Sequence, residues 1–359
     1  MTPSPKLDAL YERAMKKYYA MDRDGKSQRQ IAAAIGISES TLRGYIKRLE
    51  RPTFPKEFQP DVVVEPFPDD ELPIEDVIEF RKREFAAKKK HEEATKLIQI
   101  TVNIPGPIGI LHFGDPHVDD DGTDIATLES HSDLTRETGI FGANCGDTTN
   151  AWVGRLARLY GDQNTSRKRA IKIAEWFITR TNWMYMVGGN HDGWAGEDDP
   201  IKWIAKQVSA LYRPSEARLQ LNFPEGDPFT INARHDFSGG SMWNPTHGPM
   251  KAAQMGIRDD LFTCGHKHKS GYGVLKDPST ERTIHTVQVG SYKLYDRYAK
   301  DKGFRDQSLG PACMTVIDPL LDAGHPDRCK LFWDPHRGAQ YVRFLRNHYF
   351  DIPHFPRKP

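Results

Sequence analysis

Short apolar runs, each ended by a glycine-containing turn, dominate the chain from about residue 97 onward. They are rich in β-branched and aromatic side chains, as buried strands are. Helical periodicity fills several of the intervals, notably residues 151–181, whereas other runs follow one another closely. Strands that alternate with helices and then come in quick succession predict an α/β sandwich with mixed sheets. The runs are LIQITV (97–102), GILHF (109–113), WMYMV (183–187), DLFTC (260–264), IHTVQV (284–289), ACMTVI (312–317) and KLFW (330–333).

The first 51 residues carry a helical pattern instead. Ser27 is placed to cap a helix, with Gln30 three residues later as its reciprocal partner, and Ser38 is placed to cap a second helix. Gly36 permits a sharp turn between the two, and an earlier helix over about 6–20 would complete a three-helix bundle. The residues expected to face inward are Ile31, Ala32, Ile35, Ile37, Leu42, Tyr45 and Ile46.

This spacing resembles the helix-turn-helix family, whose second helix enters the DNA major groove. Residues 1–51 hold eleven Lys/Arg against six Asp/Glu, a local charge of +5. We therefore expect a small all-α, DNA-binding-like domain over 1–51; a helical module that docks protein is the alternative. The outward-facing candidates for DNA contact are Ser40, Thr41, Arg43 and Lys47.

A segment with little core-forming capacity follows. Six prolines and a cluster of acids between residues 52 and 76 predict a semi-extended linker. Residues 74–96 have the pattern of a charged, solvated helix, and the aromatic-rich segment 341–355 is expected to pack back on the main domain. The predicted divisions are the helix-turn-helix domain (1–51), the linker with its charged helix (52–97), the main domain (98–345) and a C-terminal tail (346–359).

Composition narrows the class of protein. The 359 residues are 38% hydrophobic and 28% charged with a net charge of +1, which suits a globular protein without a dominant whole-molecule field. No stretch approaches the roughly 18–20 apolar residues of a membrane span, and no apolar signal-peptide core is evident. The four cysteines lie far apart without a CxxC pair, as expected of reduced, buried thiols. We expect no membrane partner and a cytoplasmic location.

Metal-ligating side chains follow four of the predicted strands. The carboxyl ends of strands are where α/β folds gather their active sites, and a glycine beside each cluster lets the backbone turn sharply. Any one cluster is weak evidence, but the four together predict a common site. The segments are ILHFGDPHV (110–118), FGANCGDTTN (141–150), MYMVGGNHDG (184–193) and DLFTCGHKHKSG (260–271).

In this order, DPH, GDTTN, GNHD and GHKH resemble the calcineurin-like metallophosphoesterase family over roughly residues 105–335. The resemblance implies a four-layer αββα sandwich that hydrolyses phosphoric esters at two divalent cations. Such a pair, about 3.5–4 Å apart, offsets the charge of the phosphate and of the leaving alkoxide. A bridging carboxylate holds the cations close together, while neutral imidazole and amide ligands preserve the positive charge that attracts phosphate.

Residue by residue, the resemblance assigns metal ligands and catalytic groups. A hydroxide between the metals would be the nucleophile, and His191 would be the general acid with Asp192 as its orienting partner. Asn150 would contact a substrate oxygen. The implied ligands are Asp115, His117 and His268 for the first metal, Asp147 as the bridge, and Asn190, His266 and one further histidine for the second.

The identity of that further histidine is open from the sequence. His235 ends the alternating strand FTINARHDF (229–237) and is favoured, because ligands follow strand ends. His247, in NPTHGPM (244–250), is the alternative and is otherwise a candidate for substrate contact. Residues 119–121 are all Asp, and we expect them to form a solvated acidic turn.

The cofactor expected from this ligand set is a pair of Mn²⁺ ions, although mixed His, Asp and Asn ligation also suits Fe, Zn²⁺, Ni²⁺ or Mg²⁺. The basic segment 155–172 is either a solvated helix face or a rim that tracks a nucleic-acid backbone. Its cations are Arg155, Arg158, Arg167, Lys168, Arg169 and Lys172.

These features predict a phosphodiesterase or nuclease that acts on DNA or RNA and is delivered by the helix-turn-helix. The fusion resembles bacteriophage and prophage proteins, which implies the host cytoplasm if the chain is phage-encoded. Two alternatives stay open: a phosphomonoesterase for phosphoprotein or nucleotide with the same metal site, and a DNA-binding regulator whose catalytic domain is degenerate.

Overall fold

The computed structural model describes residues 5–22, 25–49, 70–194, 196, 199–295 and 307–349. The chain divides into two compact units, Met1–Val77 and Ile78–Pro359. Most of the predicted linker (52–69) and of the predicted tail (350–359) lies outside the described residues.

The N-terminal unit contains three helices, α1 (Pro5–Asp22), α2 (Gln28–Ile35) and α3 (Glu39–Leu49). The predicted reciprocal cap between Ser27 and Gln30 is present at the start of α2. Gly36 ends α2 in the left-handed conformation (φ 81°), which a residue with a side chain adopts only at a cost. A small apolar core forms around Ile31, Ala32 and Leu42, with Tyr18, Met21, Ile35, Ile37 and Ile46 packed against it.

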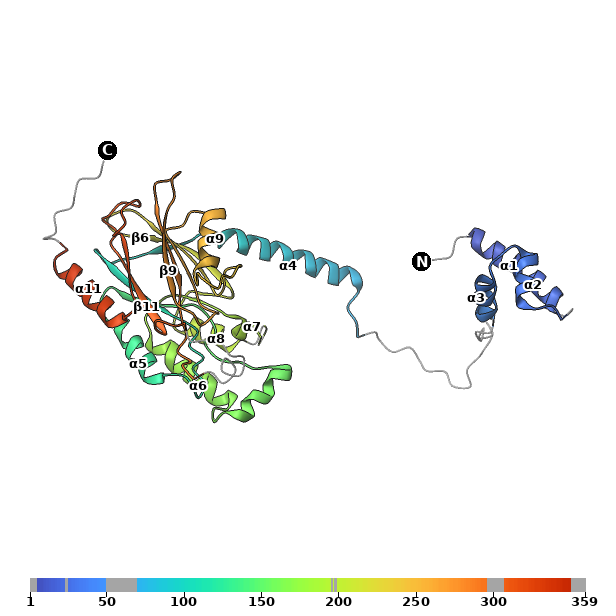
Figure 1. Cartoon of the computed structure of the whole chain (residues 1–359), viewed down its shortest axis with the longest axis horizontal. Coiled ribbons are helices and arrows are strands. Elements are labelled where there is room, and N and C mark those ends of the chain that lie inside the picture. The colour runs from blue at the N-terminus through green and yellow to red at the C-terminus, as the bar shows by residue number, and fades with distance from the viewer. Residues whose placement is uncertain are drawn as a thin grey trace. The chain divides into compact units, whose positions relative to one another are not determined.

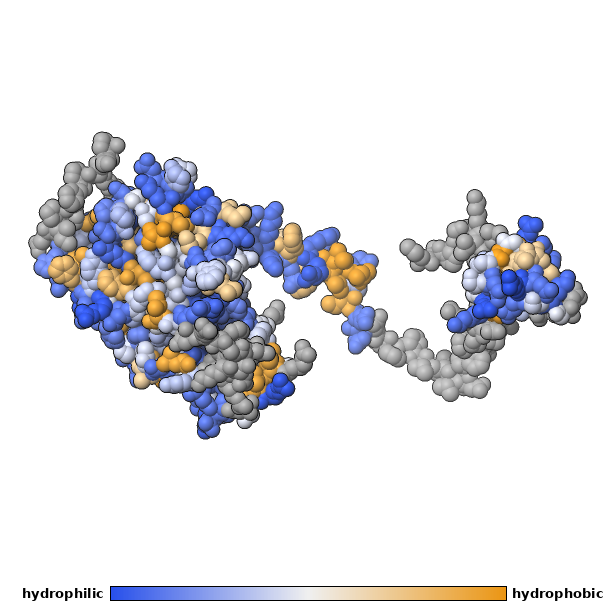
Figure 2. Space-filling view, in the orientation of Figure 1, coloured by the Kyte–Doolittle hydropathy of each residue, from blue (hydrophilic) through white to orange (hydrophobic). Residues whose placement is uncertain are grey.

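Helix α4 (Ile74–Ala94) corresponds to the predicted charged helix, and none of its residues is buried. Figure 2 shows apolar side chains along it, and Phe80 and Phe85 are among the exposed large hydrophobics of the described chain. Near its C-terminal end, His91 Nε2 lies 2.7 Å from Arg213 Nη1. Within the larger unit, this contact joins the C-terminal end of α4 to Arg213.

The larger unit is built on two mixed, six-stranded sheets. In the first sheet the spatial order is β1 (Ile98–Thr101), β6 (Glu216–Asn222), β7 (Phe229–Arg234), β8 (Leu261–Cys264), β10 (Thr283–Gln288) and β9 (Gly271–Lys276). In the second it is β12 (Cys329–Phe332), β11 (Ala312–Ile317), β2 (Ile108–Phe113), β3 (Ile140–Asn144), β4 (Trp183–Val187) and β5 (Tyr212–Arg213).

Helices cover the outer face of each sheet, which completes four layers and confirms the predicted α/β architecture. Figure 1 shows α5, α6 and α11 on one side of the sheets and α9 on the other. The second sheet carries α5 (Ile125–Leu134), α6 (Arg167–Arg180), α8 (Pro200–Gln207) and α11 (Pro335–Asn347), and the first carries α9 (His247–Met255). A 3₁₀ helix, η1 (Gly154–Asp162), precedes α6.

Strand β2 illustrates how the sequence fixes these layers. All six of its residues are buried, because successive side chains point to opposite faces and both faces are covered. Ile108 and Ile110 join the core between the two sheets. Leu111 and Phe113 join the core between the second sheet and its helices.

The parallel strands bring their carboxyl ends to one end of the sandwich. Strands β2, β3 and β4 are parallel neighbours in one sheet, and β7, β8 and β10 are parallel neighbours in the other. The segments that follow β2, β3, β4, β7 and β8 contain the predicted ligands. Among the described residues, no helix is both long enough and apolar enough to span a membrane.

Candidate metal centre

The structure brings all seven predicted ligands into one neighbourhood. Its centre is Asp147 Oδ2, which lies 3.2 Å from Nε2 of His235, 3.9 Å from Nε2 of His191 and 4.0 Å from Nε2 of His117. On the far side, His268 Nε2 lies 3.2 Å from Asp115 Oδ2. Residues separated by some 150 positions in the sequence therefore converge at the carboxyl ends of both sheets.

The backbone of this centre is held in an unusual conformation. Four predicted ligands have positive φ: His117 (39°), Asp147 (49°), His266 (67°) and His268 (50°). Left-handed backbone costs a residue with a side chain roughly 1–3 kcal/mol and persists where the surroundings dictate it. Four such residues in one cluster indicate that the backbone is strained here and that this strain orients the four side chains.

Two glycines allow the ligand loops to approach one another. A Cβ on Gly189 would overlap the carboxylate and the backbone nitrogen of Asp147, and a Cβ on Gly265 would overlap the carboxylate of Asp115. Each glycine directly precedes a predicted ligand, Asn190 or His266. Glycine is therefore required at these two positions, because no side chain fits there.

Three ligand atoms surround Nε2 of His235. Asn190 Oδ1 and His266 Nδ1 each lie 3.0 Å from it, and Asp147 Oδ2 lies 3.2 Å from it. On the other side of the ring, Nδ1 donates to the carbonyl of Cys145 at 2.8 Å. In the neutral imidazole Nε2 therefore carries a lone pair, and it faces the oxygens of Asn190 and Asp147 as well as Nδ1 of His266, which donates or accepts according to its tautomer. A cation can bind all of these atoms, whereas one proton cannot satisfy both oxygens.

Asp115 provides a second observation that fits a cation. Its side chain is completely buried, and among the described residues neither carboxylate oxygen accepts a hydrogen bond of good geometry, although His268 Nε2 lies 3.2 Å from Oδ2. A buried, unsolvated carboxylate is costly unless a positive group pairs with it. The neighbouring histidines His117 and His268, whose rings are 5.3 Å apart, complete a nitrogen and oxygen donor set that suits a divalent transition metal.

Without a metal, the cluster is stabilised by a proton shared between His235 and Asp147. Burial lowers the pKa of His235, but the hydrogen bond to Asp147 and the charges of Asp115 and Asp147 outweigh it and raise the pKa to about 10. Burial conversely raises the pKa of Asp147, yet the hydrogen bond and the charges of the surrounding histidines bring it well below the usual range. A metal that binds Nε2 of His235 must replace this proton.

Metal binding should therefore depend on pH. The pKa of His235 is raised from 6.5 to about 10, so the contribution of the protonated pair to the stability of the metal-free fold is complete below pH 6.5 and disappears as the pH rises through 10. Between pH 7 and 9 we expect Mn²⁺ affinity to increase by up to about tenfold per pH unit, with about one proton released. Calorimetry in buffers of different ionisation enthalpy measures that proton, and zero release at pH 7.5 would contradict the assignment.

His191 lies at the edge of the cluster with its ring held by the backbone. Its Nδ1 donates to the carbonyl of Asn150 at 2.6 Å, and its ring packs against Trp194 with centroids 4.1 Å apart and the ring planes tilted by 40°. The expected orienting partner, Asp192, makes other contacts: its carboxylate accepts from the backbone N–H of Thr148 and of Gly189. Asp192 thus joins the two loops that carry Asp147 and Asn190. Burial, together with the charge of Asp147, raises its pKa to about 8.

Asn150 and the acidic turn form a buried support beneath the first motif. Asn150 is buried, and its side-chain amide donates to Asp120 at 3.1 Å. The prediction of a solvated acidic turn is wrong for Asp119, which is buried and accepts from the backbone N–H of Asn150 at 2.7 Å. Asp120 pairs with Lys293 at 3.0 Å. The acids hold the loop after β3 in place.

The two candidate histidines occupy different places. His235 lies in the cluster, whereas His247 begins α9 and adjoins Gly239. All four cysteines are free and buried, as predicted.

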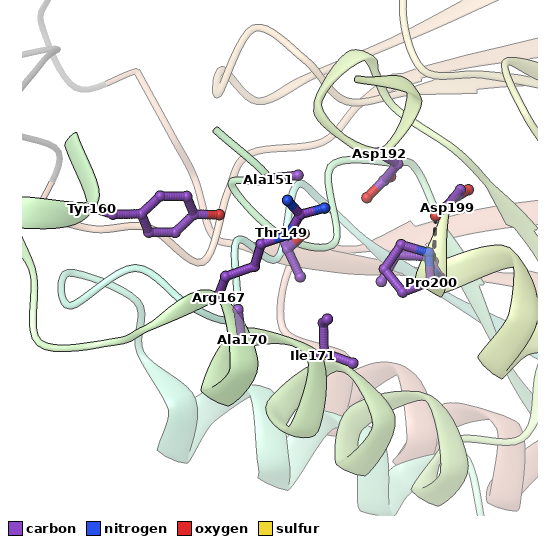
Figure 3. Close-up of a pocket in the computed structure, with 10 residues that line it drawn as sticks. Thr149, Ala151, Tyr160, Arg167, Ala170, Ile171, Asp192, Asp199 and Pro200 are labelled. Atoms are coloured by element: carbon purple, nitrogen blue, oxygen red, sulfur yellow. Dashed lines mark hydrogen bonds between the residues drawn. The ribbon is translucent and has the colours of Figure 1, made fainter. Parts of the chain in front are cut away.

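The basic segment 155–172 is exposed at each cation whose side chain is described: Arg158, Arg167, Lys168, Arg169 and Lys172. Arg167 also lines a cavity with Thr149, Tyr160, Asp192 and Asp199 (Figure 3). The cavity offers about 20 Å³, room for about one water molecule and not for a nucleotide.

Several supporting contacts have no signal in the sequence. The carbonyl of Cys145 orients His235, the carbonyl of Asn150 orients His191, and Trp194 packs against the ring of His191. The first two are backbone groups, which no residue pattern identifies. Trp194, three residues after His191, directly follows the third motif segment (184–193), and no spacing rule marks it.

Residues 20–51 match the model of the winged helix-turn-helix DNA-binding family. No curated protein matches the chain. Among the solved structures similar to it is the NAD nucleotidase of Haemophilus influenzae, with 10% identity over 63% of this chain and 49% of that chain and a TM-score of 0.32. A metallophosphoesterase of Sphaerobacter thermophilus has 16% identity over 69% of this chain and 95% of that chain, with a TM-score of 0.30. GAP50, the anchor in the inner membrane complex of Plasmodium, has 12% identity over 59% of this chain and 82% of that chain, with a TM-score of 0.30. The chain spans about half the length of the nucleotidase.

Proposed function

We propose that the chain is a divalent-metal-dependent phosphodiesterase that cleaves nucleic acid. The observation that carries this proposal is the convergence of two oxygens and a ring nitrogen on Nε2 of His235, beside the buried carboxylate of Asp115. Two cations, when bound, polarise the phosphoryl oxygens and neutralise the charge that develops on them. Mn²⁺ fits the donor set.

The ligand residues fall into two groups around Asp147. Asp147 belongs to two groups of possible ligand atoms, one with His235 and His266 and the other with His117 and His191. Asn190 adjoins His235, and His268 adjoins Asp115 and His117. Because Asp147 is common to both groups, it is the residue that would bridge two ions. Because the imidazoles and the amide are neutral ligands, the loaded centre keeps a positive charge that attracts a phosphodiester.

His191 is the proton donor of the proposed reaction. Its Nδ1 is engaged by the carbonyl of Asn150, so a proton on Nε2 is the one it can give to a leaving oxygen. Nε2 lies 3.9 Å from Asp147 Oδ2, next to the cluster. The ligand atoms of His117, Asp147 and His191 all lie within 4.8 Å of one another, so a metal count is needed to distinguish a proton donor from a ligand.

Replacing His191 should separate the two roles. In His191→Ala we expect cleavage of DNA to fall by about 10²- to 10⁴-fold while two ions per chain remain bound. Hydrolysis of bis(4-nitrophenyl) phosphate should fall by less than about tenfold, because nitrophenolate leaves without a proton. Metal analysis that finds one ion fewer than in the wild type would instead make His191 a ligand.

A substrate panel tests the function itself. Purified protein with Mn²⁺ should cleave single- or double-stranded DNA or RNA and bis(4-nitrophenyl) phosphate faster than 4-nitrophenyl phosphate. Rapid hydrolysis of the phosphomonoester without cleavage of any nucleic acid would overturn the proposal in favour of a phosphatase.

The N-terminal unit supports nucleic acid as the substrate class. Ser40, Thr41, Arg43 and Lys47 are exposed on α3, the helix expected to enter the major groove. Arg43 is paired with Glu39 at 2.5 Å, so Lys47 is the simpler probe of a phosphate contact.

Lys47→Ala should weaken binding of duplex DNA and lower the slope of log affinity against log salt by about 1. Titrations in EDTA, which prevents cleavage, measure both quantities. Lys276→Ala, an exposed lysine on β9, is the control and should leave them unchanged. An unchanged salt slope in Lys47→Ala would show that this part of α3 does not contact DNA.

A further inference from the structure

The loop between β7 and α9 carries the two most exposed neighbouring apolar side chains near the metal centre. Trp243 is 90% exposed and Met242 is 82% exposed. The chain reaches this loop directly from His235 and leaves it at His247. A tryptophan this exposed contributes little to the core, and its ring is accessible to a ligand.

The base of this loop is fixed to the metal centre. Lys267, which stands between His266 and His268, donates to the carbonyls of Phe237 at 3.3 Å and of Gly239 at 3.0 Å. The same ammonium group pairs with Asp236 at 2.8 Å. The loop therefore begins beside one ligand and is held by the residue between two others.

The tip of the loop is organised by its own hydrogen bonds. Ser241 Oγ accepts from the backbone N–H of Trp243 and of Asn244, at 3.1 and 3.2 Å. Asn244 Oδ1 accepts from the backbone N–H and the hydroxyl of Thr246, at 2.9 and 2.8 Å. These contacts define a turn that presents Met242 and Trp243 to solvent without covering either of them. A rigid platform loses little entropy when a ligand stacks on it.

We propose that Trp243 is a stacking platform for an unpaired nucleobase of the strand whose phosphodiester occupies the metal centre. An aromatic face stacks on any base and so suits a single strand of variable sequence. The exposed Lys251, whose side chain adjoins Gly239 at the base of the loop, adds a cation for the backbone of the same strand. Met242 provides a flexible apolar contact beside the ring. This inference rests on the proposed phosphodiesterase activity and specifies its substrate as a strand with unpaired bases.

The test compares Trp243→Ala, Trp243→Phe and the control Trp203→Ala in the full-length protein loaded with Mn²⁺. Trp203 is also an exposed tryptophan, but it lies on α8. With single-stranded DNA and RNA oligonucleotides, Trp243→Ala should raise KM by roughly 5- to 150-fold with kcat within about twofold. Trp243→Phe should recover most of the loss, and Trp203→Ala should match the wild type.

A substrate without a base separates this inference from the proposed function. Hydrolysis of bis(4-nitrophenyl) phosphate should be the same in all four proteins, because a small diester reaches the metals without the loop. If the wild type cleaves oligonucleotides and Trp243→Ala retains the same KM, the stacking role is overturned while the phosphodiesterase stands, and Trp243 becomes a candidate for protein contact. If the wild type hydrolyses only the aryl diester, nucleic acid as the substrate class fails, and the stacking role fails with it.

Discussion

Asp147→Asn should abolish nearly all hydrolysis while leaving the fold in place. In the proposed centre a bridging carboxylate would allow two cations to lie close together, and their joint stabilisation of phosphoryl charge would be worth several kcal/mol. That corresponds to a rate loss of roughly 10³-fold or more. Asparagine has nearly the same shape, which preserves the packing, although loss of the carboxylate removes part of the charge that holds the proton on His235 and so costs some stability without metal. We therefore expect a soluble, folded variant.

Metal analysis and kinetics together decide this prediction. The variant should bind at most one ion per chain where the wild type binds two. Asp121→Asn, in the acidic turn close to the first motif, is the matched control and should keep both ions and the wild-type rate; the Asp121 carboxylate contacts only Asn164 among the hydrogen bonds described. An Asp147→Asn protein with two ions and wild-type activity would remove Asp147 from the bridge.

Gly189→Ala, a change of one methyl group, should have an effect of similar size. The added Cβ would overlap the carboxylate and the backbone nitrogen of Asp147, so either Asp147 or the loop after β4 has to move. Overpacking of this kind lowers the free energy of unfolding by about 1–3 kcal/mol. Because Asn190 is the next residue, we expect loss of metal binding and of hydrolysis as well.

The chain offers a close control for this substitution. Gly193 lies four residues later, at the end of the short helix α7 (Asn190–Gly193), and a Cβ added there meets nothing within 4 Å. Gly193→Ala should bind both ions, hydrolyse at the wild-type rate and unfold at the wild-type denaturant concentration. A Gly189→Ala variant with normal metal content would show that the loops tolerate a wider separation than the structure implies.

The order of the motifs was enough to predict that the ligands gather. Asp115, Asp147, Asn190 and His266 each follow a buried strand, and the carboxyl ends of parallel strands meet at one edge of a sheet. The helix-turn-helix region was equally readable, because capping at Ser27 and the turn at Gly36 are local effects of neighbouring residues.

Some strands were harder to predict for identifiable reasons. Strand β3 contains Gly142 and the buried Asn144, whose amide bonds Thr148, so its apolar signal is weak. Strand β6 alternates buried and half-exposed residues, but its outward positions are charged or polar and its apolar run is short. Pairing with neighbours in the sheet, which the local sequence does not contain, makes both of them strands.

The residue types of the predicted ligands, their order along the chain and the division into a basic helical unit and an α/β unit could all be predicted from the sequence. They follow from local pattern and composition. Other features became clear only from the folded structure. It shows that His235 and not His247 enters the cluster and that Asp192 joins two segments. It also shows that backbone carbonyls orient His191 and His235 and that Asp119 is buried. Each of these depends on distances between segments far apart in the chain. Such distances are set by how two sheets pack, and no short stretch of residues encodes them.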